Sequence, residues 1–358
     1  MTRVIRFAML ACGPVALLLH FWAPERHLVI FATAVLALLP LAGYIGHATE
    51  ILAERYGGGI GGLLNATFGN AAELIIGALA LREGLIDLVK ASITGSILGN
   101  VLLVFGAAAL VGGYRRPVQR FNRTAAGVGT TMLLLSVVGL IVPALLHRVA
   151  PAESGLRLDT EIAVVLFITY LLGLVFTLRT HKDAFGVVEA SGLEEGSADA
   201  VPSGASTRNA VLLLLASTIA VAVVSEVLVG SVSATAEQLG LTQIFVGVIV
   251  VALVGNAAEH FSAVTMAAQD KMDTAIAIAV GSSTQIALFV APVLVFLSYL
   301  IAPTPMDLLF TPFEIASLGV AVLSISFIAH DGETHWMEGV QLLAVYVILA
   351  LGFFYLPH

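Results

Sequence analysis

The chain has 358 residues, of which 59% are hydrophobic and 11% are charged, and its mean hydropathy is +1.00. A soluble domain is about 45–50% apolar and about 25% charged, so this chain has too few polar residues to cover a water-facing surface. The composition therefore predicts an integral membrane protein, and the net charge of −8 gives no support to nucleic-acid binding. Cys12 is the single cysteine, which excludes an intrachain disulfide and any cysteine-based metal cluster.

Eleven apolar stretches of the sequence are long enough to cross a bilayer as helices, which takes about 20 residues each. None alternates polar and apolar residues as barrel strands do, so an all-helical fold is predicted. Arg3 and Arg6 precede the apolar core of the first stretch as in a signal peptide, but a small residue for cleavage is lacking near Phe21, and we expect a retained helix. The stretches are 5–22, 28–47, 60–81, 87–112, 124–146, 160–179, 208–230, 243–268, 273–300, 311–329 and 336–355.

The basic residues divide unevenly between the two sides of the predicted bundle. Eleven fall on the side of the N-terminus and five on the other side. Because cytoplasmic loops carry an excess of Lys and Arg, this asymmetry predicts a cytoplasmic N-terminus. The N-terminal residues carry no obvious organellar transit peptide, which favours a prokaryotic plasma membrane.

One long polar segment, beginning at Glu189, interrupts the apolar stretches. It is acidic and rich in Gly and Ser, which is typical of a solvated linker, here one on the cytoplasmic side that joins two halves of the chain. A regulatory cation site is the alternative for this composition, and we assign it no chemistry.

A five-residue motif occurs twice. Gly69-Asn70-Ala71-Ala72-Glu73 recurs as Gly255-Asn256-Ala257-Ala258-Glu259, an offset of 255 − 69 = 186, and the same offset pairs Gly95-Ser96 with Gly281-Ser282. The copies belong to the third and the eighth predicted helices. Because these helices are five spans apart, the second copy enters the membrane from the opposite face. Such an inverted repeat places substrate and ion sites at the repeat interface near the membrane midplane.

The duplicated glutamates, Glu73 and Glu259, lie inside apolar helices. An ionised carboxylate there costs about 2.5 kcal/mol or more unless it meets water, a cation or a proton. Two carboxylates in one pocket repel each other, and a divalent cation or protons relieve that repulsion. Asn70 and Asn256 stand three residues before the glutamates, on the same helix face, and supply further oxygens of the kind that calcium prefers. The motif therefore predicts a calcium site.

The residues around the motif have supporting roles in this hypothesis. Gly69 and Gly255 allow close helix approach or local unwinding, and unwound carbonyls at membrane depth must line a cavity, so both glycines belong to the predicted metal site. Polar side chains on the neighbouring helices could orient the carboxylates or complete a water-filled shell, with interhelical hydrogen bonding as the alternative, mainly for the serines. These residues are Ser96, Asn100, Ser282 and Gln285.

Three more ionisable residues are candidates for the proton step. His260 follows Glu259 and turns about 100 degrees away from it, so it either tunes a proton transfer or forms a buried hydrogen bond. Glu50 and Glu226 lie on the helices that precede each motif helix, where they either bind protons or mark a water interface. A purely structural motif would explain its Gly and Ala residues, but not two symmetry-related buried glutamates.

These residues resemble the CAX family of calcium/proton antiporters, within the cation/calcium exchanger superfamily, whose two repeats carry a Gly-Asn-Ala-x-Glu signature. The similarity extends to residues 95–100, 281–285 and 331–336. The resemblance implies eleven helices: an extra N-terminal helix at 1–23, a five-helix repeat at 24–182, the acidic linker at 183–207 and an inverted five-helix repeat at 208–358.

The resemblance also implies a mechanism. Glu73 and Glu259 would bind calcium and protons alternately, assisted by the two motif asparagines and nearby carbonyls. The helices that carry Glu50 and Glu226 would slide to alternate access. Sodium/calcium exchangers carry Ser or Thr with Pro-Glu in the corresponding motif, so protons are the expected counter-ion.

The sequence thus predicts a secondary transporter whose partners are Ca²⁺, H⁺ and the lipid bilayer, with calcium as substrate and no cofactor. A sodium/calcium exchanger and a passive cation channel are the alternatives. An intramembrane enzyme is not expected, because the chain contains no HExxH metal-ligand spacing. The sequence is compatible with an oligomer.

Overall fold

A computed structural model of the chain describes residues 3–146, 152–181 and 206–357, with the backbone alone at 3, 54, 57–63, 65–66 and 152–156. Except for its last two residues, the predicted linker at 183–207 lies outside this part of the chain. The elements of the first half are α1 (Arg3–Trp22), α2 (His27–Phe68), α3 (Ala71–Arg82), α4 (Ile86–Leu98), the π-helical turn η1 (Gly99–Val104), α5 (Phe105–Gly113), β1 (Gln119–Arg120), α6 (Arg123–Leu146), α7 (Ala152–Val175) and η2 (Phe176–Thr180).

The second half follows the same plan. Its elements are α9 (Thr207–Leu239), α10 (Gln243–Phe245), η3 (Val246–Val251), α11 (Ala252–Gly255), α12 (Ala257–Ala268), α13 (Met272–Gln285), η4 (Ile286–Val290), α14 (Ala291–Ile301), α15 (Pro312–Asp331), β2 (Glu333–Thr334) and α16 (Trp336–Phe354).

The predicted all-helical membrane fold is confirmed. Nine helices within the described residues are long and apolar enough to cross a membrane, and one bent pair adds a tenth if it is counted as one span. The total of eleven spans stays a prediction.

The expected break between the stretches 28–47 and 60–81 is wrong. The backbone is helical from His27 to Phe68 and is interrupted only at Gly69 and Asn70. The polar residues after 47 suggested a loop, but this segment also contains Ala and Leu, which with Glu and Arg are good helix formers, and a polar side chain does not end a helix by itself. The prediction located the loop by polarity, whereas the chain breaks at the motif.

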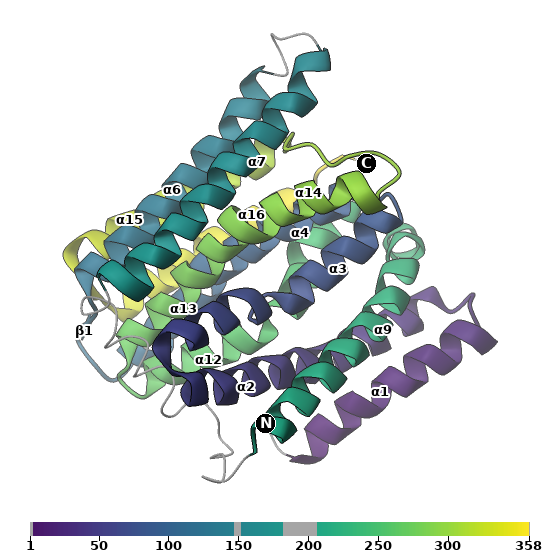
Figure 1. The fold of residues 1–358 in the computed structure, drawn as a ribbon, viewed down its shortest axis with the longest axis horizontal. Helices are drawn as coiled ribbons and strands as arrows, with labels where there is room; N and C mark the ends of the chain where they lie inside the picture. The colour runs from purple at the N-terminus through teal and green to yellow at the C-terminus, as the bar shows by residue number, and fades with distance from the viewer. Residues whose placement is uncertain (1–2, 147–151, 182–205, 358) are drawn as a thin grey trace.

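The helices form two groups on either side of the motif segments. Figure 1 shows α1, α2 and α9 packed along one side of the molecule, and α6, α7 and α15 along the opposite side. Between them lie the helices of the duplicated segments, α3, α4, α12 and α13, together with α14 and α16. We call α1, α2 and α9 the outer layer.

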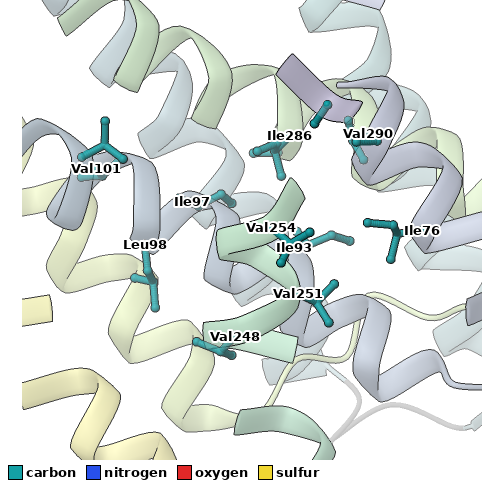
Figure 2. Close-up of a cluster of buried hydrophobic side chains, with 14 of the residues drawn as sticks. Ile76, Ile93, Ile97, Leu98, Val101, Val248, Val251, Val254, Ile286 and Val290 are labelled. Carbon is teal, nitrogen blue, oxygen red and sulfur yellow. The ribbon is translucent and has the colours of Figure 1, made fainter. Parts of the chain in front are cut away.

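The duplicated segments pack directly on each other across the two halves. Figure 2 shows Ile93 of α4 beside Val251 and Val254 of the segment that leads into the second motif. The helices can approach because Gly95 has no side chain: a Cβ built on it would lie 2.0 Å from the Val248 carbonyl oxygen. The backbones of the two halves therefore touch seven residues, about two helical turns, before the second motif.

Two short strands join the halves at the ends of the helices. β1 pairs antiparallel with β2, with Gln119 opposite Thr334 and Arg120 opposite Glu333. An Arg120 Nε to Glu333 Oε1 ion pair of 3.0 Å accompanies the strands. This link ties the loop before α6 to the loop before α16.

Candidate functional site

Both copies of the motif lie where a helix is interrupted. Asn70, with φ −103° and ψ 23°, separates α2 from α3, and Asn256, with φ −94° and ψ 15°, separates α11 from α12. The segments on either side of Asn256 are bent by 63°. Glu73 and Glu259 therefore occupy the first turn of a half-helix. The free N–H groups and the positive dipole end of a helix favour negative charge there.

Both motif glutamates have carboxylate oxygens in the interior of the protein. The Glu73 side chain is buried and the Glu259 side chain is half-buried. Among the described residues, neither oxygen of Glu73 has a hydrogen-bond partner, nor does Oε2 of Glu259. Buried polar atoms are almost always paired, so these oxygens require protons, water or a cation.

The second motif also shapes the pocket of the first. A Cβ built on Gly255 would lie 3.0 Å from Glu73 Oε1 and 3.2 Å from its Cγ. The absence of a side chain at Gly255 is thus what leaves room for the Glu73 carboxylate. The sequence predicted that Gly255 allows a helix to approach closely. In the structure it is the Glu73 side chain, from the other copy of the motif, that approaches it. Gly69 is half-buried at the end of α2.

The motif asparagines bind side chains of the opposite half. Asn70 Nδ2 donates to Gln285 Oε1 at 2.5 Å. Asn256 Nδ2 donates to Ser96 Oγ at 2.7 Å and to the Ala252 carbonyl at 2.8 Å. These bonds hold each motif against the second helix of the other repeat.

Asn100 completes the Asn256 network. Its Nδ2 donates to Asn256 Oδ1 at 3.0 Å, while its own Oδ1 is buried and has no partner among the described residues. Asn100 and Gln285 each stand where α4 and α13 pass into the π-helical turns η1 and η4. Single π-helical turns are frequent at functional sites. The free Oδ1 makes Asn100 a candidate ligand rather than only a supporting residue.

His260 lies near the glutamates but faces another neighbour. A Cβ built on Gly99 would be 3.8 Å from His260 Nε2, so the ring lies beside the start of η1. Within the described part of the chain Nε2 has no hydrogen-bond partner. The ring is thus close to the site without a described contact to either carboxylate.

Three predicted residues are not brought to the glutamate pair by a described contact. Glu50 lies on α2, with Oε2 4.0 Å from His47 Nδ1. Glu226 lies on α9 and pairs with Arg82 at 2.9 Å. Ser282 is half-buried on α13, beside Gly281.

From the sequence, Arg82 was counted only among the basic residues that set the orientation of the helices, and its ion pair with Glu226 was missed. Its position at the end of a motif helix was the available signal, because an arginine there needs a counter-ion or water. No group of three His, Cys, Asp or Glu side chains that could hold a metal occurs in the described residues. A cation at the pair would therefore need amide or backbone oxygens, as the sequence predicts.

This geometry can be compared with known proteins. The sequence model of a family described as sodium/calcium exchanger protein matches residues 26–179 and 209–355. The chain belongs to this family. The two matched segments lie on either side of the predicted linker and together span most of the chain.

Two relatives of this family member are named as calcium/proton antiporters. The Ca²⁺/H⁺ antiporter of Bacillus subtilis is 46% identical and covers 92% of each chain. That of Aphanothece halophytica is 43% identical over 99% of this chain and 97% of its own. The resemblance to calcium/proton antiporters that the motif indicated is thereby confirmed.

Solved structures agree with the fold. The structure of native YfkE superposes with a TM-score of 0.83, at 42% identity and 99% coverage of both chains. The H⁺/Ca²⁺ exchanger CAX gives a TM-score of 0.66 at 12% identity, covering 98% of this chain and 92% of its own, a likeness of fold alone.

Proposed function

We propose that this protein exchanges calcium for protons across a membrane, and that the two ions compete for the Glu73–Glu259 pair. One observation supports the proposal: the Glu73 carboxylate lies against Gly255 of the other motif copy, four residues before Glu259, and three carboxylate oxygens of the two glutamates are buried without a partner among the described residues. Relatives at 43% and 46% identity are named Ca²⁺/H⁺ antiporters, which supports the same pair of ions here.

Competition couples the two fluxes. An empty, doubly ionised pair is costly because each carboxylate is desolvated and repelled by the other. Calcium, which takes about six to eight oxygen ligands, neutralises both charges and can add amide or carbonyl oxygens and water. Protons neutralise the same two groups one by one. The pair therefore holds either calcium or protons, and only loaded states change access.

The burial of the site supports alternating access. On the first-repeat side Glu73, Ser96 and Asn100 are buried, whereas on the second-repeat side Glu259, Ser282 and Gln285 are half-buried. The outer layer of α1, α2 and α9 is the group of helices whose shift would open the other side.

The test is calcium uptake into inside-out vesicles with Glu73→Gln and Glu259→Gln. We expect near-complete loss in each variant, because the amide neither releases a proton nor neutralises calcium. Glu314→Gln is the matched control, since Glu314 is also buried but its oxygens accept from Thr94 Oγ1 and the Thr311 N–H. Full exchange in either motif variant would contradict its assigned role.

The driving ion is tested in proteoliposomes with purified protein. Uptake should follow an imposed pH gradient, and the KM for calcium should rise as the pH falls, because protons occupy the same carboxylates. Uptake driven by a sodium gradient alone would identify a sodium/calcium exchanger. Calcium flux that persists with neither gradient would identify a channel.

A further inference from the structure

Arg82, the last residue of α3, forms an ion pair that the duplicated motif does not explain. Its Nη2 lies 2.9 Å from Glu226 Oε1 on α9, and 3.4 Å from Glu83 Oε1, a second and longer contact. α3 begins at the first motif, whereas α9 belongs to the outer layer. The ion pair therefore links the far end of the motif half-helix to the outer layer.

An arginine also lies beside the end of the other motif half-helix, α12, but it comes from a distant part of the chain. Arg116, after α5, donates to the Gly112 carbonyl at 3.0 Å and to the Ala268 carbonyl at 3.3 Å, and its Nε is 3.1 Å from Asp270. Arg116 is thus held by carbonyl oxygens at the ends of α5 and α12 and by the Asp270 carboxylate. Arg82 instead points its charge at a single carboxylate on another helix. The two halves therefore differ at this position.

The exposure of the pair indicates that it is not there for stability. The Arg82 and Glu226 side chains are 47% and 61% exposed, and ion pairs this accessible contribute little to folding. Solvent-exposed partners can also separate and re-form at little cost. What the pair does change is the charge available at the end of α3: while Glu226 is bound to Arg82, its negative charge is partly offset and it attracts a cation less strongly.

The ion pair lies at the opposite end of α3 from the proposed cation site. Glu73 and Arg82 are nine residues apart on one helix, which is about 14 Å at 1.5 Å per residue. Glu226 is thus a carboxylate at the far end of the half-helix that carries Glu73. A calcium ion that left the site toward this end of α3 would meet either a free carboxylate or one already bound to a guanidinium.

We propose that Arg82 competes with calcium for the Glu226 carboxylate, and thereby lowers the affinity for calcium on the membrane face at which α3 ends. This inference rests on the proposed calcium exchange. Arg82 is a positioning residue in this role: it acts on the cation through Glu226 and touches neither motif glutamate. Low affinity on one face favours the release of calcium there.

The test is Arg82→Gln in proteoliposomes, with calcium presented on each face separately. With calcium added on the face where α3 ends, we expect the calcium concentration that half-inhibits calcium release to that face to fall by about two- to fivefold. This fold-change corresponds to the free energies typical of exposed charge pairs. On the opposite face, KM and kcat should stay close to wild type. Arg82→Lys keeps the charge and should restore most of the wild-type value.

Two further variants separate this role from a structural one. In a Glu226→Gln background, Arg82→Gln should have no additional effect, because the competed carboxylate is gone. Arg120→Gln is the matched control: its pair with Glu333 is 83% and 46% exposed and also joins the two halves, but lies at the strand link. It should leave both faces unchanged.

Several outcomes would overturn the inference while exchange itself remains intact. Arg82→Gln could match the Arg120→Gln control, change both faces equally, or keep its effect in the Glu226→Gln background. A complete loss of exchange in Arg82→Gln, with normal thermal unfolding, would also contradict it, because Arg82 would then be needed for transport itself. Failure of the proposed function would show in a different variant: Glu73→Gln would then retain calcium/proton exchange.

Discussion

The carboxylate of Glu73 lies against Gly255, although the two residues belong to different copies of the duplicated motif. A Cβ at Gly255 would stand 3.0 Å from Glu73 Oε1, which is tighter than ordinary contact. The side chain of one copy thus fills the space left by the glycine of the other. Neither copy forms the pocket by itself.

Gly255→Ala should therefore damage the site, at some cost in the stability of the fold. The added methyl group pushes the Glu73 carboxylate from its position, and overpacking of this kind costs about 1–3 kcal/mol. We expect the KM for calcium to rise about tenfold or more. Gly319→Ala on α15, where an added Cβ meets nothing within 4 Å, is the control. Wild-type calcium kinetics in Gly255→Ala would contradict the contact.

Gly95→Ala and Gly281→Ala test whether the repeat is symmetric in its packing. The two glycines are equivalent by the internal offset, yet a Cβ on Gly95 would meet the Val248 carbonyl at 2.0 Å, whereas one on Gly281 meets nothing within 4 Å. A backbone clash cannot be relieved by a rotamer change. Gly95→Ala should lose the folded protein in detergent, measured by size-exclusion chromatography, and Gly281→Ala should remain monodisperse. Equal behaviour of the two would argue against the asymmetric contact.

Asn256→Ala should destabilise the protein as well as slow transport. It removes the acceptor of the Asn100 amide and the donor to Ser96, both of which are buried. Each buried group left unpaired costs about 1–3 kcal/mol. We expect a clear fall in the thermal unfolding temperature, whereas Asn209→Ala, at an exposed position on α9, should change it little. Unchanged unfolding of Asn256→Ala would mean that water replaces the amide.

Lys90→Met should also lower stability. The Lys90 ammonium, with a side chain 10% exposed, lies 3.0 Å from Asp307 Oδ1 and donates to the Leu309 carbonyl, which fastens α4 to the loop before α15. Removing a buried charge leaves its partners uncompensated, at a cost of about 1–3 kcal/mol after allowance for the partly exposed Asp307. Asp87→Asn is the control, because its contact with Lys90 is 3.3 Å and its side chain is 73% exposed. Equal unfolding temperatures for the two variants would contradict the role given to Lys90.

Several features were predictable because they depend on local chemistry. Composition required the membrane, and the five identical residues at 69–73 and 255–259 marked the candidate site. The boundary of α2 was not predictable in the same way. Its polar residues suggested a loop, but the helix continues to Phe68 because nothing in that segment prevents helical hydrogen bonding.

The partners of the site residues were less accessible to sequence reasoning. Asn70 reaches Gln285 over 215 positions, and Arg82 reaches Glu226 over 144 positions. Such contacts depend on how whole helices pack, and no periodicity or spacing within one helix encodes them. Ser96 and Asn100 were expected near the motif, but that both bind Asn256 follows only from the crossing of α4 with the second half.

The sequence by itself determined that the protein lies in a membrane, that it is helical, and that two glutamates recur in an apolar setting. These features follow from the cost of moving each side chain out of water, which depends on the residue type and its neighbours in the chain. The tertiary structure alone decided which groups share the pocket. It brings Glu73 against Gly255 and Asn100 against Asn256. It also pairs Glu226 with Arg82, away from the two motif glutamates. The physical reason is that the interaction of charges and hydrogen-bonding groups depends on distances of a few ångströms, which only the packing of the two repeats fixes.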